Sequence, residues 1–153
     1  MTLRAFLPYE SRSKSRLLLR LDTGEDVALV VERGRLLRDG DRVSLADGRV
    51  IEIAASDESL LQATSDDPLS IAKAAYHLGN RHVAVQVIPG GLRFLEDHVL
   101  KDMVVGLGLT VTALVAPFDP EGGAYGHSHA HGSDMPLSRP KIHSYPRGTS
   151  SGT

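Results

Sequence analysis

The first half of the chain alternates short apolar runs with turn-forming residues. The runs are rich in leucine, valine and isoleucine, which is typical of β-strands bounded by turns. Asp47-Gly48, between two of the runs, predicts a two-residue hairpin loop, because type I′ turns need positive φ at both central residues. We expect an all-β domain over residues 1–65, with strands at 16–21, 26–31, 42–45 and 50–55.

After about residue 60 the pattern alternates strands with helices. Asp67 and Pro68 are typical of a helix start and Gly79 of a helix stop, and Asp97 caps a second helix. Runs with strand character lie around these helices, at 60–65, 82–88, 92–95 and 109–115. The order β-α-β-β-α-β predicts an α+β chain whose second domain is ferredoxin-like, over residues 66–116 with a first strand from about residue 59.

Helical periodicity indicates which residues of each helix share a face. In the first helix Leu69, Ala72 and Tyr76 fall on one face. The second helix directs four apolar residues towards a core, namely Leu100, Met103, Val104 and Leu107.

The C-terminal region has a different composition. From Ala116 onward, 21 of 38 residues are Gly, Pro, Ser or His, which leaves too little apolar surface for a core. We therefore expect a flexible tail over residues 117–153. Within it, His127, His129 and His131 alternate in a glycine-rich stretch.

Alternating imidazoles on an extended chain point to one side, and flanking glycines let them lean towards a single ion. Short histidine-rich tracts bind metals readily, so the tail is a candidate metal-ligating segment. A solvated polar tail that contains histidine is the alternative interpretation of the same residues.

Composition limits the chemistry available to the chain. Its 153 residues include no cysteine, so disulfides and thiolate sites are excluded and any metal takes nitrogen or oxygen ligands. The 17 Lys and Arg against 19 Asp and Glu give a net charge of -2, without the basic excess of nucleic-acid-binding proteins. No apolar stretch is long enough to span a membrane. We expect a soluble, cytoplasmic protein that binds neither nucleic acid nor membrane.

His98 is a second candidate metal ligand, placed at a predicted helix start beside Glu96 and Asp97. The field of a helix N-terminus favours neutral imidazole but opposes an incoming cation, and the adjacent carboxylates offset that opposition. One imidazole cannot hold an ion tightly, whereas a two-fold axis would supply a second copy of the ring. A structural histidine is the alternative here, and His77 and His82 fit backbone-capping or packing roles.

No pattern in the sequence marks an enzyme. The chain has no GxSxG, HExxH or phosphate-loop motif, and Asp66-Asp67 fit helix-start residues better than acid/base catalysts. RNA binding by a ferredoxin-like sheet would need stacking aromatics, but residues 82–88 contain none and Phe94 stands alone on 92–95. We therefore expect a non-catalytic protein.

Three stretches of the second half follow one another in a specific series. They read AAYHLGNRH at 74–82, DHVLKDM at 97–103 and APFDPEGGAYGHSHAH at 116–131. Together they resemble the UreE family of urease nickel chaperones. The resemblance implies an N-terminal domain similar to the peptide-binding domains of chaperones, followed by a ferredoxin-like metal-binding domain that forms a homodimer.

The resemblance also implies a site and a function. In that family the histidine of the second stretch, here His98, binds metal with its symmetry mate, and tail histidines, here His127, His129 and His131, complete the coordination. The implied cargo is Ni²⁺, delivered to the urease apoprotein together with other accessory proteins, including the maturation GTPase. Imidazole suits Zn²⁺ and Cu²⁺ as well, so the residues alone leave the metal open. A passive metal buffer or storage protein, which needs only the tail, is the alternative function.

Overall fold

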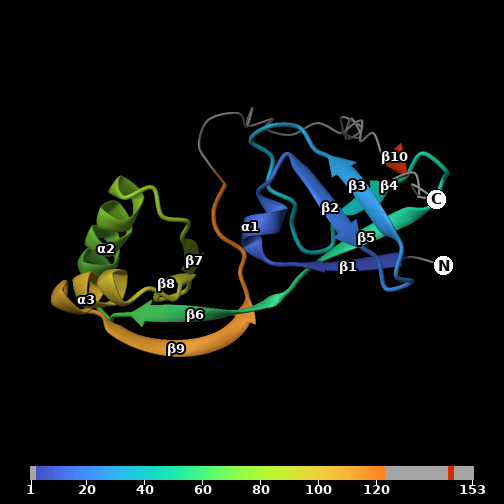
Figure 1. The fold of residues 1–153 in the computed structure, drawn as a ribbon. Coiled ribbons are helices and arrows are strands. Elements are labelled where there is room, and N and C mark those ends of the chain that lie inside the picture. Colours follow the sequence, from blue (N-terminus) through green and yellow to red (C-terminus); the bar gives the residue numbers. More distant parts are fainter. Residues whose placement is uncertain (1–2, 123–144, 147–153) are drawn as a thin grey trace. The chain divides into compact units, whose positions relative to one another are not determined.

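The computed structural model describes residues 3–122 and 145–146 and divides the chain into two compact units (Figure 1). The described residues up to Ala54, together with 145–146, belong to the first unit, and residues 55–122 form the second. Strand β6 (Asp57–Thr64) pairs with strands of the second unit, for which the sequence predicts a first strand from about residue 59. None of the helices in the described part is long and apolar enough to cross a membrane.

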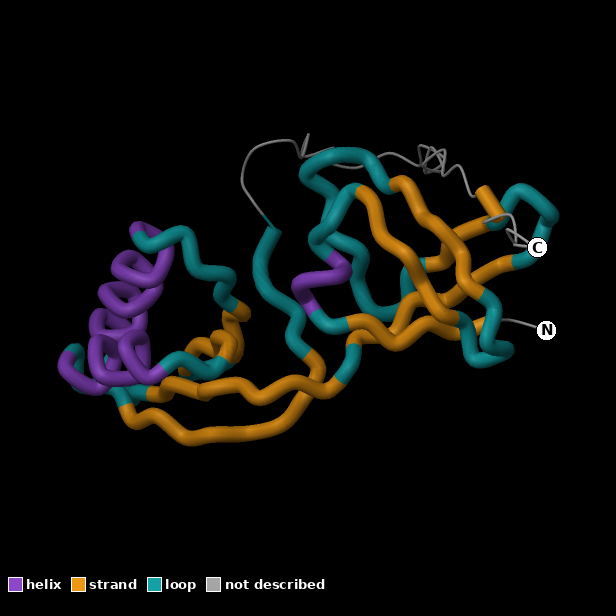
Figure 2. The backbone as a smooth tube through the Cα atoms, in the orientation of Figure 1, coloured by secondary structure: helices purple, strands orange, loops and turns teal. Residues whose placement is uncertain are grey.

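The first unit is built from two three-stranded sheets, ordered β1-β5-β4 and β10-β3-β2 (Figures 1 and 2). Their strands are β1 (Leu3–Leu7), β2 (Arg16–Arg20), β3 (Asp26–Val30), β4 (Arg42–Ser44), β5 (Val50–Ala55) and β10 (Tyr145–Pro146). Apolar side chains from both sheets form one core, in which Leu29 of β3 and Ile51 of β5 are almost completely buried. The four predicted strands are confirmed, whereas β1 and β10 were not expected.

The two hairpins of the first unit use the same loop geometry. Loops 22–24 and 46–48 each contain three residues, and their last residues, Gly24 and Gly48, have φ of 83° and 90°. Each loop is closed by a backbone hydrogen bond of 2.8 Å, from Leu21 to Glu25 and from Leu45 to Arg49. The predicted two-residue type I′ turn is therefore wrong, because the loop includes a third residue and only the glycine takes the left-handed conformation.

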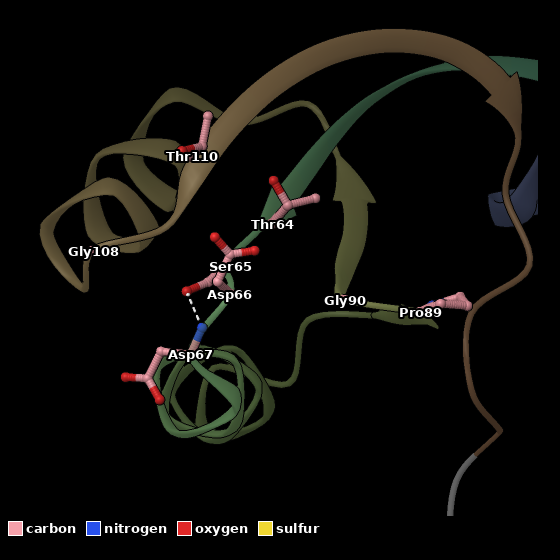
Figure 3. Close-up of a pocket in the computed structure, with 8 residues that line it drawn as sticks. All are labelled: Thr64, Ser65, Asp66, Asp67, Pro89, Gly90, Gly108 and Thr110. Carbon is pink, nitrogen blue, oxygen red and sulfur yellow. Dashed lines mark hydrogen bonds between the residues drawn. The ribbon is translucent and has the colours of Figure 1, made fainter.

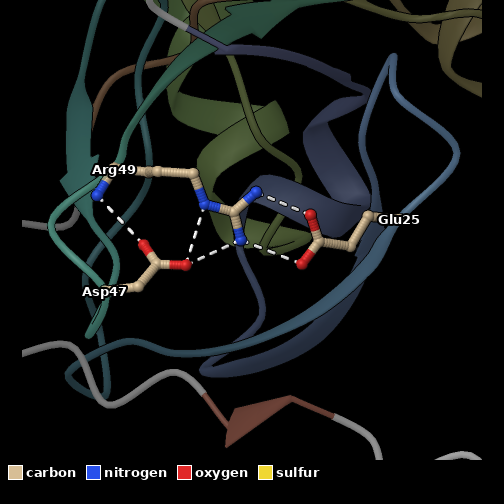
Figure 4. Close-up of polar contacts among 3 residues, drawn as sticks. All are labelled: Glu25, Asp47 and Arg49. Carbon is tan, nitrogen blue, oxygen red and sulfur yellow. Dashed lines mark hydrogen bonds and ion pairs between the residues drawn. The ribbon is translucent and has the colours of Figure 1, made fainter.

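Arg49 connects these two loops (Figure 4). Its guanidinium donates to the Glu25 carboxylate at 2.6 and 2.9 Å and to the Asp47 carboxylate at 2.8 Å. Its backbone N–H also donates to Asp47 at 3.0 Å. The side-chain hydrogen bonds hold the pKa of Glu25 below its usual range. The backbone hydrogen bond, helped by the guanidinium, does the same for the pKa of Asp47.

Arg12 ends the short helix α1 (Tyr9–Arg12) and is completely buried. Its Nε donates to the carbonyl of Leu7 at 3.1 Å and its Nη1 to the carbonyl of Leu37 at 3.3 Å. A buried cation is tolerated only where its donors are satisfied, so Arg12 joins β1 to the loop that contains Leu37.

The second unit has the predicted order β6-α2-β7-β8-α3-β9. Its remaining elements are α2 (Pro68–Asn80), β7 (Gln86–Ile88), β8 (Gly91–Leu95), α3 (His98–Gly106) and β9 (Thr110–Pro117). The four strands form one antiparallel sheet in the order β7-β8-β6-β9. This is the ferredoxin-like arrangement, so the expected fold class is confirmed.

Both helices pack on one face of this sheet, where they share a core with Phe94 of β8 (Figure 1). The predicted inner face of α3 is confirmed, since Leu100 and Val104 are buried and Met103 and Leu107 partly so. In α2 the residues that pack inward are Ile71, Ala74, Ala75 and Leu78. The face that Leu69, Ala72 and Tyr76 share is exposed to solvent.

The end of α2 differs from the expected one. The helix continues through Gly79 to Asn80, and His82 takes the left-handed position with φ of 56°. The His82 N–H donates to the Gly79 carbonyl at 3.0 Å, and Val83 donates to the Leu78 carbonyl at 3.2 Å. The end of the helix therefore includes the first residues of the predicted strand 82–88, and β7 begins only at Gln86.

Residues 117–122 are a packed part of the second unit and not the start of a tail. Phe118 has no exposed surface. The Asp119 N–H donates to Oε1 of Gln86 at 3.1 Å, and the Glu121 N–H donates to the carbonyl of Val85 at 2.8 Å. The chain thus returns from β9, at one edge of the sheet, to β7 at the other. We call residues 118–122 the strap.

Candidate metal centre

His98 is the first residue of α3, as the sequence predicts. The helix begins there because Oδ1 of Asp97 accepts hydrogen bonds from the N–H groups of Val99 (2.9 Å) and Leu100 (3.0 Å). Leu100 is buried and fixes the inner face of the helix. His98 itself is exposed, so its imidazole is available to a ligand from outside the unit.

The residues around His98 are exposed carboxylates and apolar groups. Glu96 and Asp97 are exposed and precede it, and the Glu96 N–H donates to the Ser59 carbonyl at 3.1 Å, which continues the β8–β6 ladder. Within residues 3–122 and 145–146, no three His, Asp or Glu side chains come together as a metal site. A tightly held ion at His98 therefore needs donors from beyond the described part of a single chain.

The tail histidines His127, His129 and His131 lie outside the described residues, as does His143. The two remaining described histidines do not gather at His98. His77 is exposed on α2, where its ring meets that of Tyr76 edge-on at 5.3 Å between centroids, and His82 forms the exit of that helix. The packing and capping roles expected of these two residues agree with these positions.

The strap is the feature of this region that sequence reasoning missed. It ends beside Val85, and Val85 precedes Gln86, which pairs with Arg93 of β8. The chain therefore leaves the described part next to the end of β8 that leads into His98. The signal that could have found the strap is Phe118, an isolated large apolar residue at the start of a polar stretch.

A cavity of about 620 Å³ lies at the opposite end of α3, near Gly108 (Figure 3). It is lined by hydroxyl, carboxylate and backbone groups of Thr64, Ser65, Asp66, Asp67, Pro89, Gly90, Gly108 and Thr110. The Asp67 carboxylate caps α2 by accepting from the Leu69 N–H at 3.0 Å. The positive end of the α2 dipole opposes a cation here, and the cavity contains no imidazole, so it does not share the chemistry of His98.

Large apolar side chains are exposed on both helices of this unit. Val99 and Val105 on α3 are each about half exposed, and Leu69 and Tyr76 on α2 are more exposed still. Isolated exposed apolar residues need no explanation, and these four add apolar character to the exposed surface of the two helices.

The fold and site define a class of protein: a β-sheet domain joined to a ferredoxin-like domain that presents one histidine at a capped helix start. Family models give the particular family. The UreE urease accessory protein N-terminal domain matches residues 4–56, and the C-terminal domain matches residues 58–146. The chain therefore belongs to the UreE family of urease accessory proteins, as the resemblance indicated.

Curated relatives agree with this assignment. The chain is 51% identical over 128 residues to a urease accessory protein UreE of Ralstonia nicotianae, covering 84% of this chain and 61% of the relative. It is 52% identical over 128 residues to the protein of that name from Burkholderia pseudomallei, covering 84% of this chain and 63% of the relative. The chain thus spans less than two thirds of the length of these relatives.

Proposed function

We propose that this protein is a nickel metallochaperone for urease assembly. In this proposal two copies of the chain bind one Ni²⁺ through their His98 imidazoles and transfer the ion to the urease apoprotein. The observation that carries it is the exposed His98 at the capped start of α3, in a chain of the urease accessory protein family. The other partners are urease accessory proteins, including the maturation GTPase, and the expected cytoplasmic location is part of the proposal.

The chemistry at His98 favours an exchangeable ion over a permanently held one. A single neutral imidazole per chain supplies too few donors for a closed coordination shell. The N-terminal field of α3 weakens cation binding, while the exposed carboxylates of Glu96 and Asp97 partly offset this effect. Such a balance suits a carrier, because the ion has to leave again.

Dimer formation through the helical layer would supply the second imidazole. Val99 follows His98 directly and is half exposed, and Val105 lies further along α3 with similar exposure. Burying these side chains against a second copy gains the usual stabilisation of apolar contacts. A two-fold axis near His98 would then bring two identical rings to one ion.

The strap supports a contribution from the tail histidines. The distance from Glu121 to His98 can be bounded along the sheet. The path crosses two inter-strand steps of about 4.8 Å and then follows four residues, from Phe94 to His98, at about 3.4 Å each. The two residues are therefore at most roughly 23 Å apart. A chain of ten residues from Glu121 to His131 spans up to about 33 Å when extended. His131 is therefore within reach of His98, and His129 and His127 lie closer to the strap along the chain.

The test compares His98→Ala with a chain that ends at Gly126, by nickel titration calorimetry. The truncated protein should retain one ion per dimer at reduced affinity, because it loses tail donors but keeps both His98 rings. His98→Ala should lose this shared site and keep only tail binding that scales per chain. His77→Ala is the matched control, since it removes another exposed helical histidine of the same unit and should leave nickel binding unchanged.

A passive nickel buffer that uses only the tail predicts the reverse ranking. Truncation at Gly126 would then abolish nearly all binding, and His98→Ala would leave it intact. Urease activation at limiting nickel gives the functional readout. We expect His98→Ala to impair activation more than truncation does, and the opposite order would refute the chaperone mechanism.

A further inference from the structure

Asp102 is an exposed carboxylate on α3, one helical turn after His98. Within residues 3–122 and 145–146, no ion pair or hydrogen bond engages its side chain. Exposed carboxylates are ordinary on a protein surface, so the neighbours of Asp102 decide whether it has a further role.

The register of α3 places His98 beside Asp102. Residues three and four apart on a helix are neighbours, with about 5–6 Å between their Cβ atoms. For Asp102 these neighbours are His98, Val99, Val105 and Gly106. Lys101 is next in the chain, but consecutive residues of a helix do not face each other. Among the described residues of α3, His98 is therefore the one polar side chain adjacent to Asp102.

The direction of helical side chains brings the two groups closer. Side chains on a helix lean towards its N-terminus, so each residue covers the surface of the turn before its own Cα. The carboxylate of Asp102 thus extends over the first turn of α3, where His98 lies. Spacing of i and i+4 on a helix is also that of the two zinc-binding histidines in the HExxH motif. An imidazole and a carboxylate in this register can therefore bind one divalent ion.

The valines beside Asp102 make a free carboxylate unfavourable in the proposed dimer. Val99 and Val105 are 49% and 50% exposed, and the proposed contact between two copies buries them. Asp102 lies between them on the helix surface, so the same contact takes its charge out of water. A buried charge is tolerated only where it is paired or coordinates a metal. A cation bound at His98 would supply that partner.

We propose that Asp102 is a nickel ligand together with His98 of the same chain, so that the two-fold site contains two imidazole nitrogens and two carboxylate oxygens. This inference rests on the proposed function, because it concerns the same ion. In it, the folded part of the dimer supplies four donors, and tail histidines add to this set. The neighbouring carboxylates act differently, since Asp97 caps α3 and Glu96 precedes the helix, where no helical register directs it towards His98.

The first test measures nickel binding by titration calorimetry in the full chain with its clustered tail histidines replaced. We call this variant the tail-alanine protein; it carries His127→Ala, His129→Ala and His131→Ala. Adding Asp102→Asn should weaken nickel binding at least about tenfold, because losing a group that merely supports a metal ligand already costs about 10–100-fold. Asp102 is exposed, so this variant should melt at the temperature of the tail-alanine protein.

Glu96→Gln is the matched control for a general effect of charge. It removes the same charge from an exposed position two residues from His98. We expect it to weaken nickel binding by about twofold to threefold, the usual effect of one exposed charge. Equal losses in Asp102→Asn and Glu96→Gln would overturn the proposal, because the carboxylate of Asp102 would then act through its charge and not as a ligand.

Proton NMR of the nickel-bound tail-alanine protein tests ligation directly. The unpaired electrons of Ni²⁺ shift resonances through the bonds to its ligands, so the β-methylene protons of a coordinating aspartate move far outside their usual range. These signals should be present in the tail-alanine protein and after Glu96→Gln, and absent after Asp102→Asn. If the tail-alanine protein showed no shifted aspartate signal, or if Asp102→Asn kept it, the proposal would be wrong.

His98→Ala in the tail-alanine protein separates the failure of this inference from the failure of the proposed function. It should abolish the shared site. If nickel binding survived His98→Ala, the proposed function would fail and the role of Asp102 with it. If His98→Ala abolished binding while Asp102→Asn left the affinity unchanged, the metallochaperone proposal would stand and the inference about Asp102 alone would be overturned.

Discussion

Replacing Phe118 by alanine tests whether the strap is a structural part of the second unit. Phe118 is fully buried, and the residues that follow it donate hydrogen bonds to Gln86 and Val85. A buried Phe→Ala change costs about 3–5 kcal/mol, because the lost apolar burial adds to the cavity left behind. Domains are typically stable by about 5–15 kcal/mol, so this variant should lose a large share of the stability of its unit.

The measurement is urea unfolding of the full chain, with amide exchange in β6 and β8 to assign the change to the second unit. Val115→Ala is the control, since Val115 lies three residues before Phe118, in β9, and is 69% exposed. We expect that change to stay within about 0.5 kcal/mol. If Phe118→Ala cost no more than Val115→Ala, the strap would not be packed and the argument from it to the tail would fail.

Three further predictions concern stability. Arg12→Met should cost about 2–4 kcal/mol in urea unfolding, because the carbonyls of Leu7 and Leu37 lose buried donors, and a cost equal to that of the exposed Arg4→Met would contradict this account. Arg49→Gln should lower the melting temperature at neutral pH, with a difference from the parent that disappears under acid conditions. The Arg49 side chain holds the folded-state pKa of Glu25 below its usual value and adds to the lowering at Asp47, whose main cause, the backbone hydrogen bond, survives the substitution. The contribution of the side chain is therefore present above about pH 4 and is lost as pH falls through the lowered values. A difference independent of pH would refute this explanation. Gly91→Ala should cost at least about 3 kcal/mol, because a Cβ there would meet the Ala63 carbonyl oxygen, whereas Gly79→Ala in α2 meets nothing and should stabilise by about 0.5–1 kcal/mol. Calorimetric melting of the two glycine variants gives the comparison.

Sequence reasoning found those elements of the fold whose signals are local. The caps Asp67 and Asp97 mark both long helices, and each side chain accepts the expected backbone hydrogen bonds. Strand β1 was missed because its partner β5 is distant in the sequence, so no hairpin loop between the two strands indicates the pairing. Helical spacing alone did not show which face of α2 packs inward, because Leu69, Ala72 and Tyr76 follow that spacing as well as the stripe that packs.

The same distinction applies to the candidate site. The position of His98 was predictable because a helix start is encoded within a few residues. The strap was not, because composition averaged over residues 116–153 hides the one aromatic residue that packs. The second imidazole of the proposed site belongs to another copy of the chain, so neither the sequence nor the fold of one chain contains it.

The strap links the two parts of the proposed metal centre. If the strap were not packed, the free chain that carries the tail histidines would start near residue 116, at the β9 edge of the sheet. The hydrogen bond from Glu121 to Val85 makes this free chain start at the β7 edge instead. Shortening the free chain raises the effective concentration of tail imidazoles at His98, which falls steeply with linker length. Phe118→Ala should therefore weaken nickel binding in the full chain while leaving the affinity of the Gly126-truncated protein unchanged. If Phe118→Ala weakened nickel binding equally in the full chain and in the chain that ends at Gly126, Phe118 would act on His98 itself. The strap would then have no role in the mechanism.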